Sequence, residues 1–168
     1  MKILSLLLPY LLMTVPAAAA EPRYVDAETY YTSTEMGRLL LPAGFKAARE
    51  KLNDQFHAVC ADSFCEGVVS NWAPLDLICT VDEENHVAGE CLWSFAGSFD
   101  EVDPNTGKVT VFHENRSCDL GFVGSSGLLA EFLLAAAVDK GHAFGLLLTR
   151  VPGRSDDLSL FDVLSACL

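Results

Sequence analysis

Six cysteines place the strongest constraint on how this chain folds. All of them follow residue 20, at Cys60, Cys65, Cys79, Cys91, Cys118 and Cys167. An even number of cysteines in an exported chain is typical of a disulfide framework, because disulfides persist in oxidising compartments. Six cysteines can pair in many ways, so the count predicts three disulfides without saying which residues they join.

Residues 1–20 have the layout of a secretory signal peptide. Lys2 precedes an apolar run from 3 to 15, and small residues from Ala17 to Ala20 offer a cleavage site. The alternative is a membrane anchor, which needs about 20 apolar residues, and this run is too short. We therefore expect a secreted or periplasmic protein in which residues 21–168 form a single α+β domain, with no later membrane span.

The stretch from Leu75 to Phe95 predicts one cysteine pair, because it alternates like two strands joined by a turn. Opposite residues of an antiparallel pair share a side of the sheet. Placing Cys79 opposite Cys91 therefore gathers the apolar faces of both strands on one side. This register centres the loop on Asn85 and implies three more facing pairs: Leu77 with Trp93, Leu75 with Phe95 and Val81 with Gly89.

The other four cysteines are expected to pair as Cys60–Cys65, closing a short loop, and as Cys118–Cys167, tying the end of the chain to the sheet. A zinc site is the weaker alternative: the chain has no C-x-x-C, although His57 and Cys60 have an H-x-x-C spacing. A catalytic cysteine needs a free thiol, and an even count leaves none. We therefore expect no metal and no cofactor.

Two segments have the periodicity of helices. Residues 45–59 carry apolar side chains at intervals of three and four, which is one face of an amphipathic helix. Residues 127–139 are apolar nearly all round and follow a cap at Ser125 or Ser126, so this helix is expected to be largely buried.

The ends of the domain give weaker signals. The segment 21–43 has no clean period, and we expect an extended N-terminal arm with one short helical turn at 35–40. The segment 144–151 is a strand candidate. A last helix is expected to be capped by Ser155, Asp156 or Asp157, with Leu160, Phe161, Leu164 and Cys167 on one side.

The middle of the chain predicts an antiparallel meander. The second strand of the Leu75–Phe95 stretch is expected to continue to Val102, with a bend or bulge at Gly97. Residues 103–107 read as a turn, because proline and glycine suit its special backbone positions. A strand over 108–114 and a loop over 115–118 follow.

The expected fold class is α+β. A helix packs across a curved antiparallel sheet, further helices follow at the C-terminal end, and disulfides staple the domain. At the level of topology, this order of elements resembles a cystatin-like roll. A fold of this kind does not by itself indicate a function.

The chain is strongly acidic, with 11 Lys and Arg against 23 Asp and Glu and a net charge of −12. Loss of Lys2 with the signal peptide leaves 10 basic against 23 acidic residues, or −13. Such a surface disfavours nucleic acid and suits a basic protein partner, although plain solubility is the simpler explanation. The candidate binding residues are Trp72 and two acidic segments: Asp82, Glu83 and Glu84, and Asp100, Glu101 and Asp103.

Trp72 has two interpretations. It precedes Ala73-Pro74 at a junction between a loop and a strand, where an exposed tryptophan can anchor a partner. The alternative is that it folds back over the core. Asn115 begins an Asn-x-Ser sequon, which is a glycosylation site only in a eukaryotic exported protein.

Catalytic motifs are incomplete. The stretch from Gly124 to Gly127 is one residue short of G-x-S-x-G, and helix capping explains its serines better. His113 beside Glu114 is the only histidine that we consider for acid–base chemistry. The leading hypothesis is a non-enzymatic binding module, most concretely an acidic inhibitor or immunity-type protein for a basic hydrolase. The alternatives are a small secreted hydrolase using His113 and a structural component of an envelope or matrix.

Overall fold

The computed structural model of the protein describes residues 21–60, 65, 69, 71–137, 149–154 and 156–168. The predicted signal peptide and residues 144–148 of the strand candidate 144–151 lie outside these residues. The described elements are β1 (Tyr24–Asp26), α1 (Ala27–Ser33), α2 (Glu35–Leu40), α3 (Gly44–Cys60), β2 (Ala73–Asp82), β3 (Val87–Val102), β4 (Val109–Asp119), β5 (Gly124–Ser125), α4 (Ser126–Ala137) and α6 (Leu160–Cys167).

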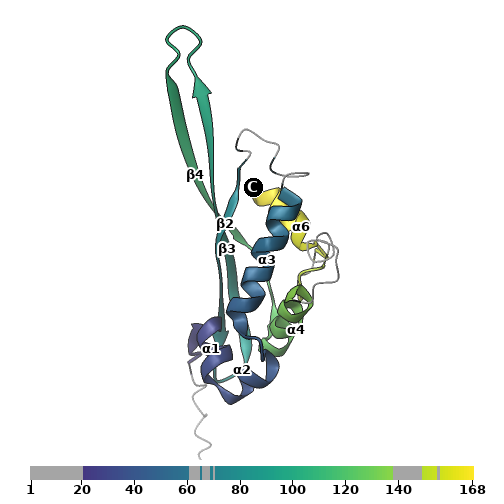
Figure 1. The fold of residues 1–168 in the computed structure, drawn as a ribbon. Helices are drawn as coiled ribbons and strands as arrows, with labels where there is room; N and C mark the ends of the chain where they lie inside the picture. The colour runs from purple at the N-terminus through teal and green to yellow at the C-terminus, as the bar shows by residue number, and fades with distance from the viewer. Residues whose placement is uncertain (1–20, 61–64, 66–68, 70, 138–148, 155) are drawn as a thin grey trace, which may run out of the picture.

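The strands form one antiparallel sheet in the order β1-β2-β3-β4, and the short β5 pairs with the start of β3. Helices α3, α4 and α6 lie on one side of this sheet, and α1 and α2 lie at one end of it (Figure 1). The predicted fold class is therefore confirmed: a helix on an antiparallel meander, with a C-terminal helix and three disulfides. No described helix is long and apolar enough to cross a membrane.

The core lies between α3 and the sheet. The predicted apolar face of α3 is buried at Phe45, Ala48, Leu52, Phe56 and Val59. The Phe56 ring lies 5.9 Å from the Trp93 ring and 4.8 Å from the Phe95 ring, measured between centroids. Trp93 and Phe95 lie on the same face of β3, and Phe56 lies on the apolar face of α3. The contact between these rings therefore joins the helix to the sheet.

The three disulfides join the predicted cysteines. Cys79 and Cys91 face each other across β2 and β3, with their Cα atoms 4.1 Å apart. Cys60 and Cys65 form a disulfide just past the end of α3. Cys118 in β4 is joined to Cys167 at the end of α6, across a sequence separation of 49. The last disulfide therefore fixes the C-terminal helix to the sheet.

Two β-bulges between β2 and β3 correct the predicted register at both ends of β2, while Leu77 still faces Trp93. The first has its extra residue, Leu75, in β2, and the second has its extra residue in β3, between Ala88 and Cys91. The alternation on which the prediction rests carries no signal for an extra residue in one strand. The observed facing pairs are Pro74 with Phe95 and Val81 with Ala88, in place of Leu75 with Phe95 and Val81 with Gly89.

The second bulge also changes the hairpin loop. Asp82 pairs with Val87, so the loop consists of residues 83–86 and has no central residue. The predicted odd loop centred on Asn85 is wrong, because the bulge between Ala88 and Cys91 takes up one extra residue of β3.

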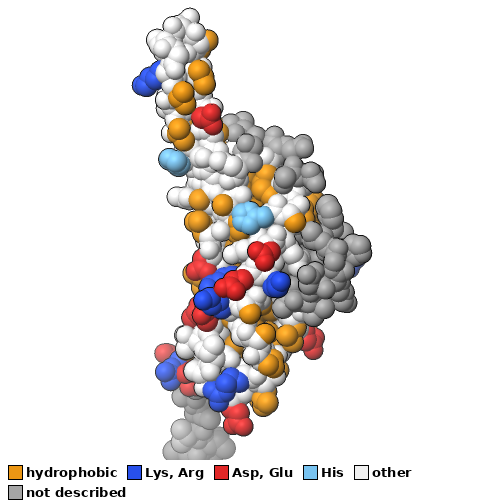
Figure 2. All heavy atoms as spheres, viewed as in Figure 1, with side chains coloured by type: hydrophobic (Ala, Val, Ile, Leu, Met, Phe, Trp, Pro, Cys, Tyr) orange, Lys and Arg blue, Asp and Glu red, His pale blue; other side chains and the backbone are white. Residues whose placement is uncertain are grey.

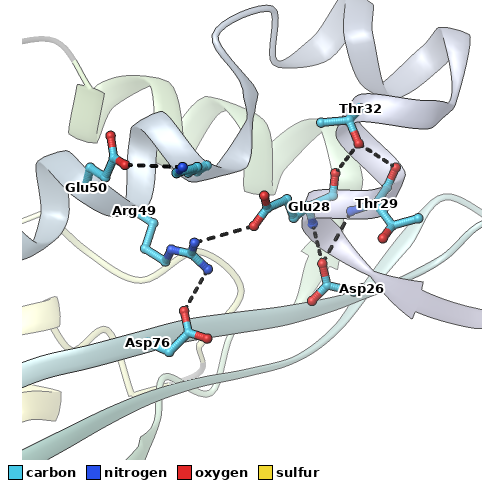
Figure 3. A network of polar contacts seen from close by, with 8 residues as sticks. Asp26, Glu28, Thr29, Thr32, Arg49, Glu50 and Asp76 are labelled. Carbon is cyan, nitrogen blue, oxygen red and sulfur yellow. Dashed lines mark hydrogen bonds and ion pairs between the residues drawn. The ribbon is translucent and has the colours of Figure 1, made fainter.

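The N-terminal segment is folded rather than extended, which corrects the predicted arm at 21–43. β1 pairs with the end of β2, and α1 follows directly. The Asp26 side chain begins α1 by accepting hydrogen bonds from the backbone N–H groups of Glu28 and Thr29 (Figure 3). The short helix at 35–40 is present as α2.

The caps of the later helices follow from serine side chains. Ser125 accepts a hydrogen bond from the Leu128 N–H at the start of α4. The cap of α6 is Ser159, which forms a reciprocal capping box with Asp162. This corrects the predicted cap at Asp156 or Asp157, which do not directly precede the first helical residue, Leu160. The third candidate, Ser155, lies outside the described residues.

β3 ends at Val102 as predicted, and β4 is longer than expected. Their pairing runs without a register shift from Leu92–Asp119 to Val102–Val109. The bend or bulge expected at Gly97 is absent from its pairing with β4. A Cβ there would lie 2.4 Å from Val69 Cγ1 and 2.9 Å from Trp72 Cε3, so the glycine makes room for these two side chains. The loop expected over 115–118 is part of β4, and Asn115 is an exposed residue within that strand.

Candidate functional site

The ends of β3 and β4 project from the body of the molecule as a two-stranded ribbon (Figure 1). We call residues 98–113 the arm. Every residue from Asp100 to His113 is exposed. β3 has 16 residues and β2 has 10, so β3 continues beyond its partner and only β4 accompanies it in the arm. The arm therefore contributes little to the core.

The tip of the arm is held by its own side chains. Asp103 accepts hydrogen bonds from the backbone N–H groups of Asn105 and Thr106, at 2.8 and 3.3 Å, and from the Thr106 hydroxyl at 2.8 Å. Gly107 has a φ of 68°, the left-handed conformation expected for glycine in this turn. The backbone N–H of Asp103 donates to the Lys108 carbonyl and closes the hairpin.

These hydrogen bonds affect the charge at the tip. They lower the pKa of Asp103, chiefly through the bond from the Asn105 N–H and then through the Thr106 hydroxyl. The carboxylate form therefore supports the turn above the usual Asp pKa of 3.8, and this support is lost as the pH falls through the lowered value. Asp103 is therefore ionised near neutral pH, where its carboxylate accepts the hydrogen bonds of the turn.

Large apolar side chains are exposed on the arm, and Figure 2 shows them along its length. Val102, Val109 and Val111 are 56, 57 and 54 % exposed. Val102 faces Val109, and Val111 is two residues further along β4, so the three share one face of the ribbon. Phe112 is 39 % exposed and stacks on Phe99 on the opposite face, with the ring centroids 4.8 Å apart.

Acidic residues surround these apolar side chains. The arm carries Asp100, Glu101 and Asp103 against one basic residue, Lys108. All four are exposed. The arm thus presents apolar side chains on both faces together with a net negative charge.

Trp72 lies at the base of the arm and is buried, with 4 % of its surface exposed. The Arg116 guanidinium lies over its ring, 5.4 Å from the centroid. Arg116 also pairs with Glu114 at 2.7 Å and donates to the Leu168 carbonyl at 2.8 Å. Trp72 therefore lies folded over the core, beneath a contact that connects β4 to the end of the chain.

His113 and Glu114 are not brought together. They are consecutive in β4, so their side chains point to opposite faces of the ribbon. His113 faces Ser98 on the same side as the three valines, whereas Glu114 is engaged with Arg116. The structure therefore places this candidate acid–base pair on two separate surfaces.

The acidic turn at 82–84 lies at the other end of β3. Sixteen residues of strand separate the two ends, which is about 50 Å. Asp82 is buried and its pKa is lowered, first by the hydrogen bond from the Asn85 side chain. Glu83 pairs with Arg23 at 2.9 Å, and Glu84 is exposed. The two acidic segments therefore do not form one binding face.

Several other polar groups in the described residues have structural partners. Arg49 of α3 joins Glu28 of α1 and Asp76 of β2, at 3.5 and 2.6 Å (Figure 3). Ser126 is buried, where its carbonyl accepts a hydrogen bond from the Tyr31 hydroxyl at 2.6 Å. In the part of the chain that the structure describes, no three His, Cys, Asp or Glu side chains are grouped to hold a metal ion.

Sequence reasoning found the acidic residues of the arm but missed its apolar ones. Val109, Val111 and Phe112 read as ordinary strand residues that pack on a core. Their exposure depends on where β2 ends beside β3, and this is a property of the tertiary structure. An indication of the arm is the length of β3, because a strand that is longer than the strand before it extends beyond that neighbour.

No protein-family model, curated protein or solved structure matches this chain.

Proposed function

We propose that this is a non-enzymatic, secreted or periplasmic binding protein that engages a basic protein through the β3–β4 arm. The observation that carries the proposal is the arm, which exposes Val102, Val109, Val111 and Phe112 beside three acidic residues. Exposed apolar side chains that are grouped together mark interaction sites on soluble proteins. The most concrete partner is a basic hydrolase whose cleft receives the arm.

The shape and chemistry of the arm fit this role. A narrow ribbon presents two faces and a tip at once, so it suits a concave partner surface. Burial of its valine and phenylalanine side chains would supply the apolar centre of an interface, and the acidic residues would form the polar rim. The negative charge speeds association with a basic partner through electrostatic steering.

The three disulfides support the location. Disulfides are typical of oxidising compartments such as the periplasm or the extracellular space, and they stabilise the body from which the arm projects. None of the three disulfides lies within the arm, so they stabilise the body without the arm residues. The arm residues can therefore serve binding without being needed for folding.

The test compares two charge variants that each remove two carboxylates. In the arm variant, Asp100→Asn and Glu101→Gln act on the ribbon; in the control variant, Glu84→Gln and Glu131→Gln act on exposed sites elsewhere. The immobilised proteins are offered the native exported fraction at about 50 mM salt, where exposed charges are weakly screened. We expect the wild type and the control to retain a basic protein.

The arm variant is expected to bind the retained protein with an association rate lowered by about fivefold to tenfold, and with a smaller change in dissociation. The wild type should lose most of its advantage at about 500 mM salt, because the Debye length becomes shorter than the separation of the charges. Capture of no basic protein at low salt, or equal association rates for the arm and control variants, would contradict the proposal.

A further inference from the structure

We infer that the partner contributes an extended basic segment that adds to the outer edge of β4 as a further strand of the sheet. This inference rests on the proposed function and specifies how the arm binds. Strand addition supplies affinity through main-chain hydrogen bonds and specificity through alternate side chains. The edge in question runs along residues 109–113.

The direction of the backbone groups follows from the hydrogen bonds within the arm. In an antiparallel pair, every second facing pair exchanges its N–H and C=O groups, and the pairs between them direct these groups outward. The Asp103 N–H donates to the Lys108 carbonyl, so this pair is an inward one. Counting along the regular register, Val109, Val111 and His113 direct their N–H and C=O groups away from β3.

The opposite edge of the arm, along β3, provides an independent check on the direction of these backbone groups. The same count directs the N–H of Ser98 away from β4, and this group donates to the Asn71 side chain at 2.6 Å. The Asn71 amide in turn donates to the Ser98 hydroxyl at 2.7 Å. Asn71 thus occupies the place of a neighbouring strand at the base of the β3 edge.

The two edges of the arm differ in protection. Natural proteins protect edge strands with charged side chains, proline or bulges. The β3 edge has Asn71 at its base and Asp100 at its next outward position. The β4 edge has valine at 109 and 111, and its pairing with β3 has no bulge. Within the described residues, no strand pairs with this edge of β4.

The charge of the arm indicates which kind of segment pairs with the β4 edge. A second copy would bring the same acidic arm, from a chain with a net charge of −12, against the first. Like charges at close range oppose such pairing. A segment that alternates apolar and basic residues fits instead. Its apolar side chains would lie beside Val109 and Val111, and its basic side chains on the other face, near Phe112 and Glu101.

The experiment uses the full chain and a labelled peptide of about five Val-Lys repeats, which has the alternation that a strand on this edge requires. A peptide of the same composition with its valines and lysines in two blocks is the control for charge. Binding is measured by fluorescence anisotropy. We expect the alternating peptide to bind at least about tenfold more tightly than the block peptide, because only it pairs along the edge.

Two proline variants distinguish the edges. Val111→Pro removes an outward N–H from the β4 edge, and Val102→Pro removes one from the β3 edge; both delete an exposed valine. We expect Val111→Pro to weaken peptide binding by about tenfold or more. Val102→Pro is expected to weaken it by about threefold at most, because it removes an exposed valine but no N–H of the β4 edge. Protected amides of Thr110 and Phe112, which point toward β3, confirm that the ribbon remains paired.

The outcomes separate this inference from the proposed function. If Val111→Pro retains the basic partner from the exported fraction as well as the wild type does, strand addition is wrong and the proposed function stands. Equal effects of the two proline variants, or equal binding of the two peptides, would overturn the inference. A wild-type dimer that Val111→Pro dissociates, with no peptide binding, would assign the edge to a second copy and overturn it too.

Discussion

Replacing Cys118 and Cys167 together by alanine is expected to lower the free energy of unfolding by about 4 kcal/mol. The disulfide closes a loop with a sequence separation of 49, the longest of the three, and the loss of such a link increases the entropy of the unfolded chain. It also fixes α6 to β4 beside the Arg116 contact at the base of the arm. The measurement is urea-induced unfolding without reductant.

The other two disulfides are matched controls. In the same chain-entropy model, removal of Cys79–Cys91 costs about 3 kcal/mol and removal of Cys60–Cys65 about 2 kcal/mol, because their loops are shorter. The order of the three losses is the decisive result. A loss for Cys118–Cys167 no greater than that for Cys60–Cys65 would show that the link does not restrain the C-terminal helix as described.

Phe56→Ala is expected to lower the free energy of unfolding by about 3–5 kcal/mol. Phe56 is fully buried at the contact between α3 and the sheet, where its ring packs against Trp93 and Phe95. Truncation removes apolar contacts on both layers and leaves a cavity that the disulfide-bonded body cannot easily fill. Urea or thermal unfolding measures the loss.

Phe112→Ala is the control, because it removes the same side chain from the arm. Phe112 is 39 % exposed and contacts Phe99 rather than the core, so we expect a loss below about 1 kcal/mol. A large loss for Phe112→Ala would mean that the arm's apolar residues serve stability. In that case their exposure would no longer support a role in binding.

The parts of the fold that could be predicted from the sequence are those with strong local periodicity. The α3 face of Phe45, Leu52 and Phe56 and the facing of Cys79 and Cys91 both follow from side-chain direction along a helix or a strand. The pairing of Cys118 with Cys167 was the remaining choice once the nearer pairs were assigned.

The errors have physical causes that periodicity does not report. The two bulges between β2 and β3 change the register at both ends of β2 but leave the alternation around Leu77 intact. Helix α1 is short and depends on its cap at Asp26 and on burial of Tyr30 and Tyr31, which are tertiary contacts. The early end predicted for β4 came from polar residues at 115–117, which are tolerated in a strand because that strand has an open face.

The candidate site was predictable in part. The acidic residues at 100, 101 and 103 were identified, and the structure places them on the arm. The valines beside them were not, because exposure of an apolar strand depends on which neighbours it lacks. Trp72 was conspicuous in the sequence, yet its burial beneath Arg116 depends on a residue 44 positions away.

The central claim is that the arm is the binding surface, and shortening the arm tests it most directly. Residues 100–111 are replaced by an Asn-Gly turn, which suits a two-residue hairpin and keeps the Phe99–Phe112 pair at its base. The affinity of this variant for the basic protein retained from the exported fraction is then compared with that of the intact chain. The account predicts a variant that remains folded with its three disulfides and loses binding by about a hundredfold or more. Binding equal to that of the intact chain would contradict it.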